Sequence, residues 1–76
     1  MTDLELTCAL HHETDRAVLV SETGEEARAV WLPRSKIEIA PKAKRIMATR
    51  RDGQSEMVPL VTVTMPEWLA IRNGFV

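Results

Sequence analysis

Alternation of apolar and polar residues predicts that the chain begins with short strands. Residues 4–10 alternate with a period of two, which is the pattern of a strand with one buried face. Residues 16–21 contain the run AVLV, and four consecutive apolar residues are typical of a strand buried on both faces. Residues 26–32 alternate again. Polar turns at 11–15 and 22–25 separate these runs, so we expect an antiparallel meander.

Two prolines interrupt the extended segments in the middle of the chain. Pro33 ends the third strand because it has no N–H to donate to a neighbouring strand. Residues 34–36 are expected to form a single helical turn, after which 37–39 return to an extended conformation. Pro41 then marks a bend in the chain.

A hairpin follows. Residues 44–50 and 56–65 form its two arms, and the turn at 51–54 contains Asp-Gly, which accepts the positive φ angles of a tight turn. Pro59 in the second arm indicates a strand edge or a bulge.

The chain closes with a predicted helix over residues 66–73. Thr64 and Glu67 have the spacing of a capping box, and Gly74 stands where a left-handed helix end is expected. The predicted fold is therefore mainly β (α+β): a small twisted antiparallel sheet or partly open barrel with one short C-terminal helix. Three bulky residues are expected to anchor its core, and these are Trp31, Trp68 and Leu69.

Length and composition indicate one soluble domain spanning residues 1–76. The single cysteine, Cys8, excludes an intramolecular disulfide and fits a reducing compartment. No apolar run is long enough to cross a membrane, and the N-terminus has no signal-peptide pattern. A cytoplasmic location is expected.

The sequence offers little catalytic or metal-binding chemistry. His11 and His12 are adjacent, so they point to opposite faces of an extended chain and cannot easily bind one metal ion. Ser35 has no histidine near it in sequence, and the three scattered glycines form no phosphate-binding loop. We expect neither an enzyme nor a bound metal or cofactor.

Charge is the most uneven property of the chain. Residues 1–33 carry seven acidic and two basic residues, whereas residues 34–51 carry seven basic residues and one acidic residue. The candidate partner-binding residues are Arg34, Lys36, Lys42, Lys44, Arg45, Arg50 and Arg51. They form either a solvated hairpin face or a surface for phosphate groups or an acidic protein. The turn containing Glu22, Glu25 and Glu26 is the alternative working surface.

Three segments carry a resemblance: AVLV at 17–20, VWLPRSKIE at 30–38 and VTMPEWLA at 63–70. Together they resemble a small domain common in bacteriophages and prophages. Arg34 stands where that domain usually has a lysine, and residues 42–53 are more basic than usual. Phage proteins of this type include anti-CRISPR inhibitors, so the resemblance implies a non-enzymatic protein that docks on a CRISPR surveillance complex and blocks binding of target DNA.

Three functional hypotheses follow. The first is an inhibitor that binds a host protein or nucleoprotein complex, such as a CRISPR effector. The second is a nucleic-acid-binding accessory module that uses the basic 34–51 segment directly. The third is a structural or assembly protein that forms a homodimer through an exposed strand edge.

Overall fold

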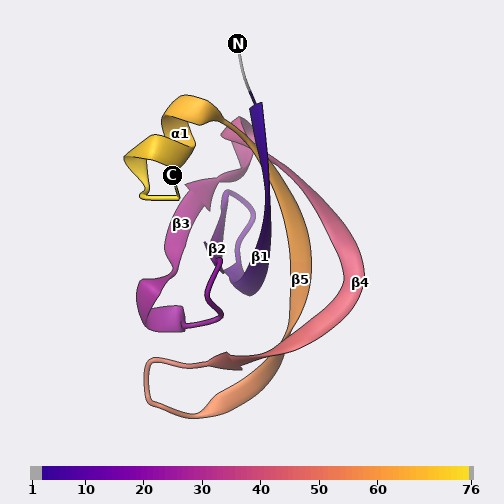
Figure 1. The fold of residues 1–76 in the computed structure, drawn as a ribbon, viewed down its shortest axis with the longest axis vertical. Helices are drawn as coiled ribbons and strands as arrows, with labels where there is room; N and C mark the ends of the chain where they lie inside the picture. Colours follow the sequence, from indigo (N-terminus) through magenta and orange to yellow (C-terminus); the bar gives the residue numbers. More distant parts are fainter. Residues whose placement is uncertain (1–2, 76) are drawn as a thin grey trace.

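The computed structural model describes residues 3–75, which form one antiparallel sheet with a short helix at its end (Figure 1). The five strands in this range have the order β3-β2-β1-β5-β4. Their bounds are β1 Asp3–Glu13, β2 Ala17–Ser21, β3 Val30–Pro33, β4 Glu38–Thr49 and β5 Ser55–Pro66. The helix α1 spans Glu67–Arg72, and two 3-10 turns, η1 and η2, span Glu26–Arg28 and Arg34–Lys36. The predicted fold class is confirmed.

The main core lies where β1 pairs with β5. Leu6 is opposite Val63 and Cys8 is opposite Val61 in this antiparallel ladder, so one face of both strands is apolar. The buried members of the cluster are Cys8, Val18, Val20, Leu32, Val61, Val63, Met65, Leu69 and Ala70. The alternation predicted for the first strand is therefore the alternation that builds the core.

Strand β2 is buried on both faces, as its run of apolar residues predicts. Val18 and Val20 point into the main core, and Leu19 is buried on the opposite face. Leu19 is opposite Trp31 in β3 and opposite His12 in β1.

Strand β1 is longer than predicted, because residues expected to form a turn remain in the sheet. His12 and Glu13 continue the pairing with β2, after a bulge between Leu10 and His12. The turn to β2 is reduced to the next three residues, where the Thr14 Oγ1 accepts hydrogen bonds from the N–H groups of Arg16 and Ala17.

The segment after β2 also differs from the prediction. Residues 26–28 form the 3-10 turn η1 rather than the start of a strand, and β3 begins only at Val30. Gly24 has φ +84°, a left-handed conformation that glycine adopts without a steric penalty. The chain then leaves β2 to contact β4, where Glu25 bridges to Thr49. The segment thus contacts β4, and β3 pairs with β2 only through residues 30–33.

Strand β4 begins at Glu38 instead of at residue 44, and it contains the bend expected at Pro41. The bend is a bulge between Pro41 and Arg45, within which Ala43 has φ +57°. Pro59 of β5 lies opposite Arg45, directly beside this bulge, and β1 pairs with β5 only from Leu60 onward. Pro59 is therefore tolerated because its strand is locally unpaired on the β1 side.

The β4–β5 hairpin continues beyond the last β1–β5 pair, Ala9 with Leu60, and curves under the rest of the sheet (Figure 1). Its turn is the predicted one, with Gly53 at φ +87°. A second small core forms where the hairpin folds back, from Ala9, Ala48 and Val58 with Ile46 beside them. Because Ala9 follows Cys8 in β1, this cluster lies on the opposite side of β1 from the main core.

The helix differs from the prediction at its start and agrees at its end. Thr64 is a β5 residue paired with Glu5 and Glu38, and the N-cap is Pro66 without a side-chain hydrogen bond. The predicted capping box is therefore wrong. Gly74 has φ +78°, and the N–H of Phe75 donates to the carbonyl of Ala70 at 2.9 Å, which ends the helix as predicted.

The positions of the two tryptophans contradict the prediction that both anchor the core. Trp31 is 51% exposed and Trp68 is 47% exposed, so neither is the buried anchor expected. In β3 the inward position belongs to Leu32, and on the six-residue helix it belongs to Leu69 and Ala70. Leu69 is buried, as predicted.

Candidate functional site

Most of the predicted cationic site lies along β4 and its turn. Lys42 and Lys44 lie within the bulge, Arg45 lies at its end, and Arg50 and Arg51 lie at the tip of the hairpin. All five residues are exposed. We call them the β4 cationic segment. Strand β4 is at one edge of the sheet, so no further strand among residues 3–75 covers its outer side.

Within the described residues, these cations are mostly free of acidic partners. The ion pairs in this range are Arg28–Glu25, Arg34–Glu13 and Arg50–Asp52. The Arg50–Asp52 pair is exposed and long, at 3.8 Å, so it contributes little stability. Lys42, Lys44, Arg45 and Arg51 therefore remain available to a ligand or partner.

Arg34 does not belong with this group. Its guanidinium donates from Nη2 to Glu13 Oε2 at 2.7 Å and from Nε to the carbonyl of Thr14 at 2.8 Å. These contacts tie η2 to the β1–β2 turn. Arg34 is thus already paired with an acidic residue of the same chain.

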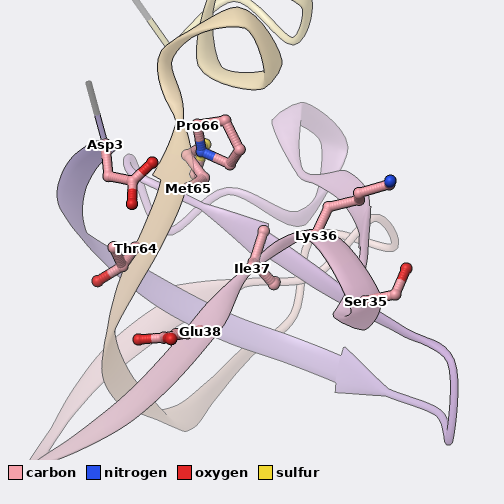
Figure 2. A pocket seen from close by; sticks show the side chains of 8 residues that line it. All are labelled: Asp3, Ser35, Lys36, Ile37, Glu38, Thr64, Met65 and Pro66. Carbon is pink, nitrogen blue, oxygen red and sulfur yellow. The ribbon is translucent and has the colours of Figure 1, made fainter. Parts of the chain in front are cut away.

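Lys36 is also separate from the β4 cationic segment. It lines a shallow surface hollow together with Ser35, Ile37, Asp3 and Glu38. Figure 2 shows the Lys36 side chain extending away from the carboxylates of Asp3 and Glu38, which lie on the other side of the hollow. The hollow is mixed in charge, so it does not continue a positive surface.

The hairpin tip is hydrogen-bonded to the acidic turn that contains Glu22, Glu25 and Glu26. The N–H of Thr49 donates to the Gly24 carbonyl at 2.9 Å, and the N–H of Arg51 donates to Glu26 Oε1 at 3.0 Å. Acidic and basic segments that are far apart in sequence therefore meet. The two candidate surfaces are neighbours, and Glu26 acts as an anchor for the basic turn.

The hairpin presents one buried and one exposed face. Ile46 is opposite Val58 on the face that forms the second core. On the other face Met47 is directly opposite Met57, and these side chains are 61% and 50% exposed. This pair was not predicted from the sequence, although the Asp-Gly turn fixes the register that brings the two methionines together.

His11 and Ser21 form a second contact that was not predicted from the sequence. His11 Nε2 lies 2.7 Å from Ser21 Oγ, which also accepts a hydrogen bond from the N–H of Gly24. Ser21 is only 2% exposed, so its hydroxyl holds the loop and is not presented to a substrate. Burial lowers the pKa of His11, against the opposing effect of Glu26 and Glu56.

Cys8 is the other buried group with nucleophilic chemistry. Burial, with a smaller effect of the Glu22 carboxylate, raises the pKa of its thiol to about 11. Cys8 is part of the main core, and at neutral pH it is a small apolar side chain.

Residues 3–75 contain no group of three or more His, Cys, Asp or Glu side chains placed to hold a metal ion. Within the same residues, no helix has both the length and the apolar character needed to cross a membrane.

The chain was compared with protein-family models, with curated proteins and with solved structures, and none of them matches it.

Proposed function

We propose that this chain is a non-enzymatic binding protein that docks through the β4 cationic segment on a negatively charged surface. The observation that carries the proposal is the set of exposed cations on an edge strand and its turn, four of which have no acidic partner among the described residues. Positive charge presented in this way accelerates encounter with an acidic or phosphate-rich partner and makes binding sensitive to salt.

The resemblance to small phage domains supports a narrower form of the proposal. In that form, the chain acts in the cytosol of a bacterial host and binds a nucleoprotein complex, and a CRISPR surveillance complex is the target that the resemblance implies. Occupying the positions on such a complex that receive target DNA would block DNA binding without any catalysis. A phage plating assay on hosts with active CRISPR systems tests this form. Restored plating of a targeted phage supports it, and unchanged plating across the panel contradicts it.

Direct binding of nucleic acid is the second candidate function, because the same cations can neutralise phosphates. Fluorescence anisotropy with duplex and single-stranded DNA of random sequence distinguishes the two. Tight binding that weakens steeply with salt supports the nucleic-acid module. Absence of DNA binding, together with recovery of a protein complex from host cytosol, supports the inhibitor.

The double change Arg50→Glu with Arg51→Glu tests the surface itself. We expect binding to the recovered partner to weaken by more than tenfold, which corresponds to about 1.4 kcal/mol. The fold should persist, because the only ion pair lost among residues 3–75 is the exposed Arg50–Asp52 contact. The matched control reverses charge at the acidic turn, with Glu22→Lys and Glu25→Lys. If the control loses binding and the arginine variant keeps it, the acidic turn is the binding surface.

A further inference from the structure

The exposed face of the β4–β5 hairpin is unusual because it combines apolar side chains with cations. Arg45 is opposite Pro59, and Met47 is opposite Met57, two residues further along the same face. Directly opposed residues in an antiparallel pair have their side chains in contact range. Single exposed apolar residues are common on protein surfaces, but here two methionines lie side by side.

This face is presented by a firmly held element. The opposite face of the hairpin is packed in the second core, with Ala48 and Val58 almost fully buried. The Ile46 side chain faces Gly24, where a Cβ would lie 3.6 Å from Ile46 Cδ1. Backbone hydrogen bonds from Thr49 and Arg51 then fix the tip to the neighbouring loop. A preorganised surface loses little conformational entropy when a partner binds.

The chemistry of the face selects among classes of partner. A phosphate backbone interacts with cations and gains nothing from methionine, and bases stack on aromatic side chains, which this face lacks. Methionine is flexible and polarisable, so it adapts to leucine or phenylalanine side chains of a protein. The surrounding cations, Arg45 beside the methionines and Arg50 and Arg51 at the tip, complement acidic side chains.

We infer that the partner is a protein segment in which acidic residues flank an apolar side chain, and that Met47 and Met57 receive this side chain. The inference rests on the proposed function and specifies the partner class. The face continues at Pro59 into a surface hollow of mixed polarity, lined by Leu10, His11, His12 and Glu13.

Two synthetic peptides of equal length and equal glutamate content test the inference. In one the remaining positions are serine, and in the other they include leucine and phenylalanine. Isothermal titration with the full chain should give at least tenfold tighter binding to the apolar peptide. Met47→Ser with Met57→Ser should remove that difference, whereas Met47→Leu with Met57→Leu should keep it. Ile71→Ser, a change at an exposed apolar residue on α1, is the matched control and should have no effect.

The outcomes separate the inference from the function on which it rests. Equal binding of the two peptides, or an apolar preference that survives the serine changes, overturns the inference. Binding of duplex DNA or of anionic lipid vesicles as tightly as the apolar peptide overturns it also, by assigning the face to another class of partner. If Arg50→Glu with Arg51→Glu leaves binding of every probe unchanged, the proposed function fails as well. Thermal melts of each variant verify that the fold is retained.

Discussion

At the scale of single residues, the Ser21 hydroxyl is the point where three parts of the fold meet. It is buried, it accepts a hydrogen bond from Gly24 at 3.1 Å, and it lies 2.7 Å from the imidazole of His11. Gly24 in turn accepts the hydrogen bond that holds Thr49 of β4. The position of the hairpin therefore depends on a short chain of polar contacts that begins at His11.

This dependence predicts a pH effect on stability. Burial lowers the pKa of His11 below its ordinary value, so folding favours the neutral imidazole. The stabilisation that results is complete above the unfolded pKa of about 6.5 and is lost as pH falls below it. His11→Gln should therefore reduce the fall in unfolding free energy between pH 7 and pH 5, measured by urea denaturation with tryptophan fluorescence. The matched control is His12→Gln at the exposed neighbour. An unchanged pH dependence in His11→Gln would contradict the role given to this contact.

Cys8 gives a second prediction at this scale. Its side chain is fully buried and its thiol pKa is raised to about 11, so the reactive thiolate is scarce at pH 8. We expect iodoacetamide to leave the native protein unmodified and to alkylate it rapidly in concentrated urea, as followed by intact-mass spectrometry. Rapid alkylation of the native protein would show that β1 opens from β5 far more often than this packing implies.

At the scale of elements, the sequence predicted those that depend on local pattern. The apolar run of β2 and the Asp-Gly turn of the hairpin need no information beyond neighbouring residues. The extension of β1 through His12 and Glu13 depends instead on pairing with β2, and the segment leading into η1 is placed by the contact of Glu25 with Thr49 of β4. A polar segment that pairs in a sheet cannot be distinguished from a turn by alternation alone.

In the helix, too, the sequence pattern did not show which bulky residue is buried. Trp68 is bulky but half exposed, and the adjacent Leu69 is the residue packed in the core. Leu69→Ala should lower the unfolding free energy by about 2–5 kcal/mol, through lost burial and a cavity. Trp68→Ala should cost clearly less, because about half of its surface is already in water. Chemical denaturation of both variants, with circular dichroism as the probe, compares them directly. A larger loss for Trp68→Ala would show that α1 docks through its tryptophan.

At the scale of the whole molecule, residues that are clustered in sequence do not necessarily form one surface. A strand advances about 3.3 Å per residue, and the molecule is 39 Å long. Five of the seven predicted cations therefore spread along β4 and its turn, whereas Arg34 pairs with Glu13 and Lys36 borders a separate hollow. The charge count located a segment that the structure places mainly on one strand, β4, and its turn. The pairing of Arg34 with Glu13 depends on a tertiary contact, and the exposed methionine pair depends on the register of two strands. Neither can be predicted from composition.

The position of the cations on an edge strand leads to the last prediction. An unpaired edge invites pairing with another chain, and bulges, prolines and lysines are the features that prevent it. Strand β4 has all three, with Pro41, the positive φ of Ala43, and Lys42 and Lys44 in the same short stretch. The opposite edge, β3, has only four residues and ends in a proline. Neither edge favours the homodimer considered from the sequence, so we expect a monomer in size-exclusion chromatography with light scattering.

Replacing both bulge lysines should weaken this protection. Lys42→Thr with Lys44→Thr removes two charges from the edge and adds residues that favour strands, so we expect measurable self-association at concentrations where the wild-type chain is monomeric. Lys36→Thr, which lies outside the strand in η2, should leave the chain monomeric and controls for the change of charge.

The variant with both Lys42 and Lys44 replaced also distinguishes two roles of these lysines, partner binding and protection of the strand edge. If it self-associates while binding acidic partners normally, the bulge lysines protect the edge and the hairpin tip alone carries binding. A wild-type dimer, or a variant that stays monomeric at high concentration, would mean that the bulge charges do not guard this edge.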